Sequence, residues 1–144
     1  MGPFLLDANV LIALCWPEHS LHGRAQRWFA GHGHLSWATC PFTQTAFVRI
    51  LSNPAFSPHA LTARDALGLL LSNLGHPNHQ FWAASIPVGD AITRVGARLQ
   101  GHRQIIDAYL VGLAAHRKGK FATMDGGVIG LVGEAYRGVV EFVR

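Results

Sequence analysis

Short runs of apolar, strand-forming residues alternate with longer segments in which apolar residues recur at helical spacing. The short runs predict strands at residues 3–6, 35–40, 80–84, 121–124 and 139–143. The longer segments predict helices over residues 10–14, 20–30, 43–51, 63–74, 90–100 and 105–116. This alternation predicts an α/β fold with a mostly parallel central sheet wrapped by helices.

Polar residues mark the expected starts of three of these helices. Thr43, Thr62 and Asp90 stand where N-cap residues are favoured. In the helix expected from Asp90, the spacing places Ile92, Val95 and Leu99 on the buried face.

Chain length and composition are those of one globular domain covering residues 1–144. Hydrophobic residues make up 49% of the 144 residues and charged residues only 14%, which favours a large core and argues against disorder. The formal net charge of +4 weakly favours an anionic partner such as nucleic acid.

Cysteine usage and hydropathy bear on the compartment. Cys15 and Cys40 lie in apolar sequence, and their spacing matches neither a disulfide framework nor a CxxC metal pair. No signal-peptide pattern is seen, and no apolar run approaches the roughly 20 residues of a membrane span. We therefore expect a cytoplasmic protein with no membrane partner.

Three aspartates are the strongest candidates for chemistry. Asp7 and Asp125 each follow an apolar strand, and the carboxyl ends of parallel strands meet at one edge of a sheet. Asp107 begins the helix before the Asp125 strand, so the same edge is within its reach. Gathered carboxylates repel one another unless a hard cation such as Mg²⁺ or Mn²⁺ binds them. On local sequence alone, Asp7 is equally an N-cap residue, and Asp107 equally an acid that stabilises a helix N-terminus.

The residues around these aspartates resemble a known family. The chain is similar to the PIN-domain nucleases, and most closely to the VapC toxins of bacterial toxin–antitoxin pairs. The resemblance covers nearly the whole length in the family's order, through LLDANVL at 5–11, CPFTQ at 40–44, FVRILSNP at 47–54, QIIDAYL at 104–110 and FATMD at 121–125.

This resemblance implies a three-layer α/β/α sandwich and a metal-dependent endoribonuclease. Asp7, Asp107 and Asp125 match the acidic metal-site positions, so the resemblance implies that they are catalytic and bind Mg²⁺ or Mn²⁺. Gln44 stands where the family often has a glutamate, and an amide cannot serve as an anion or a base. Three acids therefore suggest one firmly held ion and a second that enters with substrate.

Asn9, Thr43 and Gln44 are candidates for orienting the site or the substrate. Arg49 and Arg103 lie near site-bearing segments and are candidates for contacts to the RNA backbone. As partners, the resemblance implies an RNA substrate, a cognate antitoxin and a second copy of the chain in a homodimer.

Two other functions remain open from the residues. Gln44 is compatible with a non-catalytic PIN-like module that binds RNA or an antitoxin. Asp7 also suits a phosphatase nucleophile on another α/β fold, but that chemistry needs a second aspartate at the position that Asn9 occupies.

Overall fold

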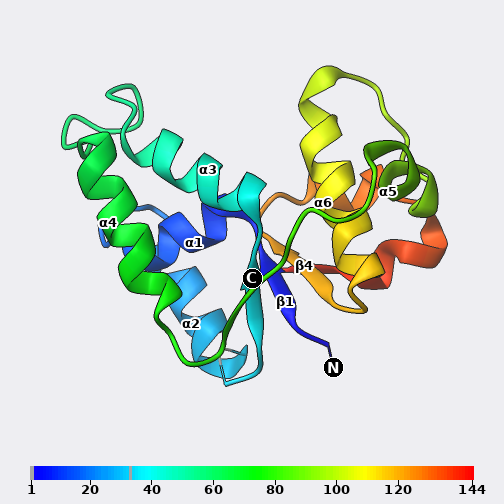
Figure 1. The fold of residues 1–144 in the computed structure, drawn as a ribbon, viewed down its shortest axis with the longest axis horizontal. Helices are drawn as coiled ribbons and strands as arrows, with labels where there is room; N and C mark the ends of the chain where they lie inside the picture. Colours follow the sequence, from blue (N-terminus) through cyan, green and yellow to red (C-terminus); the bar gives the residue numbers. More distant parts are fainter. Residues whose placement is uncertain (1, 33) are drawn as a thin grey trace.

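A single five-stranded sheet forms the centre of the molecule. The computed structural model describes residues 2–32 and 34–144. The strand order is β3-β2-β1-β4-β5, and each neighbouring pair is parallel, which confirms the predicted α/β sheet. Figure 1 shows its central strands β1 and β4 between the helices. The strands are β1 (Phe4–Leu6), β2 (Trp37–Thr39), β3 (His79–Phe81), β4 (Lys120–Thr123) and β5 (Val140–Phe142).

The α-helices are α1 (Ala8–Cys15), α2 (His22–His32), α3 (Pro41–Leu51), α4 (Ala63–Leu74), α5 (Val88–Arg94), α6 (Ile105–His116) and α7 (Gly127–Leu131). The bounds of α4 and α6 are those predicted, and Thr62 caps α4 by accepting a hydrogen bond from the Asp65 N–H at 3.1 Å. Helix α7 and the 3₁₀ segments η1 (His102–Gln104) and η2 (Glu134–Val139) were not predicted. None of the described helices combines the length and apolar character needed to cross a lipid bilayer.

Two of the three predicted N-caps are wrong. Helix α3 begins at Pro41, with Cys40 rather than Thr43 in the N-cap position. Helix α5 begins at Val88 after Pro87, so Asp90 lies inside its first turn. In both cases a proline near the start is the better signal, because its fixed φ suits the first helical turn.

The end of α5 also differs from the prediction. The helix stops at Arg94, and Gly96 adopts a φ of +58°, a left-handed conformation that glycine takes without a steric penalty. The chain therefore leaves the helix direction before Leu99, which is 40% exposed instead of buried. Val95 is buried as expected.

Helices cover both faces of the sheet, which confirms the α/β/α arrangement. Side chains alternate along each strand, so Phe4 and Leu6 face one layer and Leu5 faces the other. The first layer contains α1–α4, and the second contains α5, α6 and α7, with α5 and α6 on the opposite side of the sheet in Figure 1.

Helix α6 is fixed against α5 by a close backbone approach. A Cβ at Gly112 would overlap the backbone carbonyl of Ala91, so glycine is required at this crossing. The Tyr109 hydroxyl donates a hydrogen bond to the Ile86 carbonyl at 2.9 Å, before α5 begins. These contacts set the position of the first turn of α6, which carries Asp107.

Candidate functional site

Asp7 lies at the carboxyl end of the central strand β1. It occupies the N-cap position of α1, but its side chain makes no capping hydrogen bond. Its Oδ2 instead accepts a hydrogen bond from the Thr123 hydroxyl at 2.8 Å, at the end of the neighbouring strand β4. The carboxylate is therefore held mainly from the end of β4, although the backbone amides of Ala8 and Asn9 also lower its pKa.

Thr123 is a site residue that sequence reasoning missed. Its side chain is fully buried, and its Oγ1 also accepts a hydrogen bond from the Asp125 N–H at 3.1 Å. One hydroxyl thus holds the Asp7 carboxylate and the backbone of Asp125. In the sequence Thr123 appears only as a strand residue; its place two positions before Asp125 is the only signal that could have found it.

Asp107 and Asp125 line a small hollow of about 140 Å³, and the Asp7 charge acts on Asp107. Asp107 is half-buried in the first turn of α6, whereas Asp125 is exposed in the connection from β4 to α7. The Asp125 Oδ1 accepts a hydrogen bond from the Gly127 N–H at 2.9 Å. The other lining residues are Arg103, Gln104, Gly127, Val128 and Leu131.

The three carboxylates interact electrostatically. Burial, followed by the negative charges of Asp7 and Asp125, raises the pKa of Asp107 to about 6. Burial also raises the pKa of Asp7, with a contribution from the Asp125 charge, although the hydrogen bond from Thr123 opposes this rise. In the described part of the chain, no Lys, Arg or His nitrogen lies within 4.0 Å of these carboxylates. Within the described residues, their mutual repulsion is therefore not relieved by an ion pair with a basic side chain.

The donor set fits a hard divalent cation. Carboxylate oxygens are the ligands that Mg²⁺ and Mn²⁺ prefer, and the uncompensated charge favours cation binding. Among residues 2–32 and 34–144, however, no three His, Cys, Asp or Glu side chains converge closely enough to ligate one ion together. A Mg²⁺ ion typically keeps several of its waters, so this arrangement suits an ion held partly through water.

Gln44 is hydrogen-bonded to β2 and not to the acids. Its Nε2 donates to the Thr39 Oγ1 at 2.9 Å, and this oxygen also lies 2.7 Å from the His79 Nε2. Within the described residues no hydrogen bond joins Gln44 to any of the three aspartates. The Gln44 amide nitrogen thus donates a hydrogen bond to β2, and a carboxylate at this position has no N–H with which to donate it.

Thr43 is buried in the first turn of α3, where its Oγ1 accepts a hydrogen bond from the Cys40 N–H at 3.0 Å. Its hydroxyl contacts are therefore local to the helix start. Asn9 is exposed in the first turn of α1, two residues after Asp7. Arg103 is exposed and lines the same hollow as Asp107, while Arg49 is exposed on α3.

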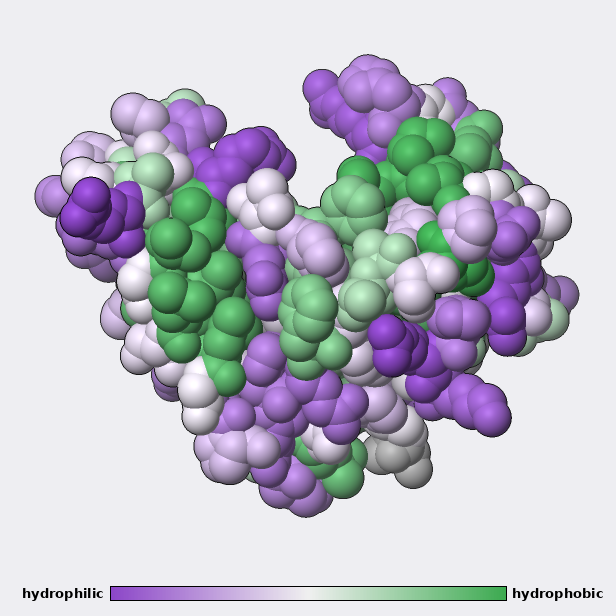
Figure 2. Space-filling view, viewed as in Figure 1, coloured by the Kyte–Doolittle hydropathy of each residue, from purple (hydrophilic) through white to green (hydrophobic). Residues whose placement is uncertain are grey.

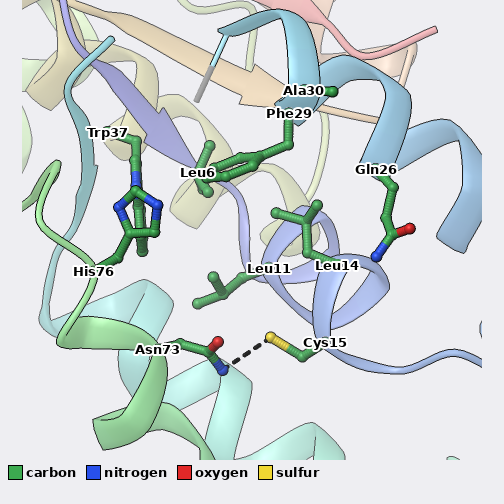
Figure 3. Close-up of a pocket in the computed structure, with 10 residues that line it drawn as sticks. All are labelled: Leu6, Leu11, Leu14, Cys15, Gln26, Phe29, Ala30, Trp37, Asn73 and His76. Carbon is green, nitrogen blue, oxygen red and sulfur yellow. Dashed lines mark hydrogen bonds between the residues drawn. The ribbon is translucent and has the colours of Figure 1, made fainter. Parts of the chain in front are cut away.

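A separate apolar hollow of about 330 Å³ lies among α1, α2, α4 and β2 (Figure 3). In it Asn73 Nδ2 donates a hydrogen bond to Cys15 Sγ at 3.0 Å, and burial raises the pKa of this thiol to about 11. None of its lining residues is a carboxylate, so this hollow offers no acidic metal ligands. It is lined by Leu6, Leu11, Leu14, Cys15, Gln26, Phe29, Ala30, Trp37, Asn73 and His76.

Comparison with curated proteins identifies the family. The chain is 36% identical over 139 residues to Ribonuclease VapC38 of Mycobacterium tuberculosis, covering 96% of both chains. It is 39% identical over 139 residues to Ribonuclease VapC39 of the same organism, covering 95% of this chain and 96% of that protein. Ribonuclease VapC29, also from M. tuberculosis, is 40% identical over 133 residues, covering 90% of this chain and 91% of that protein.

The chain belongs to the VapC family. No family model matches it. The resemblance seen in the sequence is therefore confirmed, and this VapC chain is an endoribonuclease toxin. In this chain Asp7 and Asp125 follow β1 and β4, and both charges raise the pKa of Asp107.

Replacing Asp107 with Asn should stabilise the VapC chain in a pH-dependent way. In the folded protein Asp107 keeps its proton up to about pH 6, whereas the unfolded chain loses it near pH 4. Stability contributed by this group therefore falls as the pH rises from about 4 to 6 and stays low above that. At pH 7.5 in EDTA we expect Asp107→Asn to gain about 1 kcal/mol, or roughly 2–4 °C in Tm.

Thermal melts of both proteins at pH 4.5 and pH 7.5 check this. The gain should be small at pH 4.5, where Asp107 is protonated in the folded state. An equal gain at both pH values, or a lower Tm for the variant at pH 7.5, would contradict the electrostatic account.

Thr123→Val should weaken both the fold and the site. The substitution keeps the shape but removes the hydroxyl, leaving the Asp7 Oδ2 and the Asp125 N–H without this partner. We expect a loss of about 1–3 kcal/mol in the free energy of unfolding, measured by urea denaturation, together with slower RNA cleavage. Thr123→Ser keeps the hydroxyl and should cleave RNA faster than the valine variant. A serine variant as slow as the valine variant would contradict the role of the Thr123 hydroxyl in orienting Asp7.

Proposed function

We propose that this VapC-family chain is a cytoplasmic, Mg²⁺- or Mn²⁺-dependent endoribonuclease whose catalytic and metal-binding residues are Asp7, Asp107 and Asp125. The observation that supports it most is the coupled carboxylate cluster without a basic partner at the carboxyl edge of a parallel sheet. A bound divalent ion would supply an activated water and neutralise the charge that develops on the phosphodiester.

The side chains around the cluster have distinct roles in this proposal. The three aspartates hold the cation together, partly through its bound waters. Thr123 fixes the orientation of Asp7, and the Gly127 N–H does the same for Asp125. Arg103 lines the same hollow and offers a cation to a phosphate of the RNA backbone.

As partners we propose RNA, a cognate antitoxin and a second copy of the chain in a homodimer. VapC membership supports the antitoxin. Exposed apolar residues on α4, including Leu67 and Leu71, form a hydrophobic strip on the molecular surface that supports a protein contact (Figure 2). An apolar strip of this kind favours burial against a partner.

The rival function is a non-catalytic module that binds RNA or an antitoxin. One observation favours it. The Gln44 amide is hydrogen-bonded to Thr39, so position 44 adds no fourth acid to the cluster that would hold the metal.

The deciding experiment incubates the purified chain with total RNA in Mg²⁺, in Mn²⁺ and in excess EDTA. The nuclease proposal predicts cleavage only with metal, and a loss of at least about 100-fold in Asp7→Asn and Asp125→Asn, which remove cation-holding charge. Asp65→Asn, in the first turn of α4, is the matched control and should cut RNA like the unaltered chain.

Two outcomes would count against the proposal. Cleavage that persists in EDTA or in Asp7→Asn would show that these acids do not hold a catalytic ion. RNA binding without cleavage at any Mg²⁺ or Mn²⁺ concentration would favour the non-catalytic module.

A further inference from the structure

A second hollow lies beside the acidic cluster, between α3 and the first turn of α6. Its volume is about 360 Å³, and Figure 2 shows a notch on this side of the molecule between the two helices. The hollow is lined by Pro41, Phe42, Thr45, Ala46, Arg49 and Ile106.

This hollow and the acidic one are lined by consecutive residues of α6. Ile106 lines the apolar hollow, and the next residue, Asp107, lines the acidic one. Consecutive residues on a helix lie about 100° apart, so the two hollows open on adjoining faces of one helical turn. A chain of nucleotides bound with a phosphate at the acids would therefore have a neighbouring nucleotide within reach of Phe42.

The Phe42 ring is exposed but held in place. It is 38% exposed and packs edge-to-face on Tyr109, with ring centroids 5.2 Å apart and planes at 74°. Tyr109 is itself buried and fixed by its hydrogen bond to Ile86. The exposed part of the Phe42 ring is thus a preorganised apolar surface that needs no rearrangement to receive a ligand.

The other lining residues favour a nucleotide over an apolar peptide. Ile106 is 47% exposed and adds apolar area, while the exposed side chain of Arg49 places a cation at the same hollow. Unpaired bases stack on aromatic rings and on guanidinium planes, and arginine also pairs with phosphate. A base inside a duplex has both faces covered by its neighbours and cannot stack on Phe42.

We propose that this hollow binds one unpaired base of the RNA substrate next to the phosphate held at the acids. The inference rests on the proposed nuclease function and assigns a base-binding residue beside the candidate active site. Phe42 is then a specificity-determining residue that provides the stacking surface, with Ile106 and Arg49 beside it.

The test measures RNA binding separately from cleavage. In an Asp7→Asn background, stem–loop RNAs carry 2-aminopurine either in the loop or in the stem, and fluorescence quenching and anisotropy report stacking and affinity. We expect Phe42→Ala and Phe42→Leu to weaken loop binding by about tenfold or more and to abolish the quenching in the loop. Phe42→Tyr should keep both signals.

Phe81→Ala is the matched control, because Phe81 is another exposed phenylalanine that lines neither hollow. It should bind like the background protein. The leucine variant keeps most of the apolar packing against Tyr109, so it decides the question even where the alanine variant fails to fold.

Three results would overturn the proposal: unchanged affinity and quenching in Phe42→Leu, equal affinity for a fully paired duplex, or loss of a homodimer in Phe42→Ala with RNA binding intact. The last would assign the hollow to a protein contact. If cleavage requires Asp7 but RNA binding is unchanged in the Phe42 variants, this inference is wrong and the nuclease function still holds. Phe42-dependent binding without any cleavage removes the nuclease function and leaves a base-binding site.

Discussion

The hydrogen bond from Thr123 to Asp7 is the contact on which the site depends. It exists because β1 and β4 are parallel neighbours in a register that pairs Leu6 with Ala122, so the residues that follow this pair, Asp7 and Thr123, lie side by side. The Asp7 N–H reinforces this register by donating to the Ala122 carbonyl at 2.9 Å. A slip of one residue would turn Thr123 to the other face and leave the Asp7 carboxylate without its donor.

The same arrangement makes the site a source of instability in the absence of a cation. Burial and repulsion raise the pKa values of Asp7 and Asp107, which means that their ionised forms are disfavoured in the folded protein. The cost is tolerated because both faces of the sheet bury large apolar clusters, including Phe4, Phe47 and Phe121. Apolar packing therefore holds together charges that would otherwise separate, and perturbed pKa values of this kind are typical of functional sites.

Sequence patterns correctly predicted the features that depend on local periodicity and on the positions of strand ends. The bounds of α4 and α6 and the placing of Asp7 and Asp125 at one sheet edge follow from such patterns. The role of Thr123 did not, because its partner Asp7 lies 116 residues away in the chain. Thr39 lies close to Gln44 in the chain, but periodicity does not say that the turn from β2 into α3 brings their side chains together. Leu99 was misplaced for a related reason, since Gly96 redirects the chain within an apparently periodic segment.

The position of Gln44 bears on how many ions the site would hold. The Gln44 amide is neutral and hydrogen-bonded to Thr39, so the negative charge of the cluster comes from the three aspartates. One divalent ion leaves this cluster with a single negative charge, whereas two ions would leave it positive. A positive cluster is stable only beside an anion, and the phosphate of a bound RNA is such an anion. On this charge balance a second ion would enter together with substrate, and Arg103, which lines the same hollow, would add to the attraction for that phosphate.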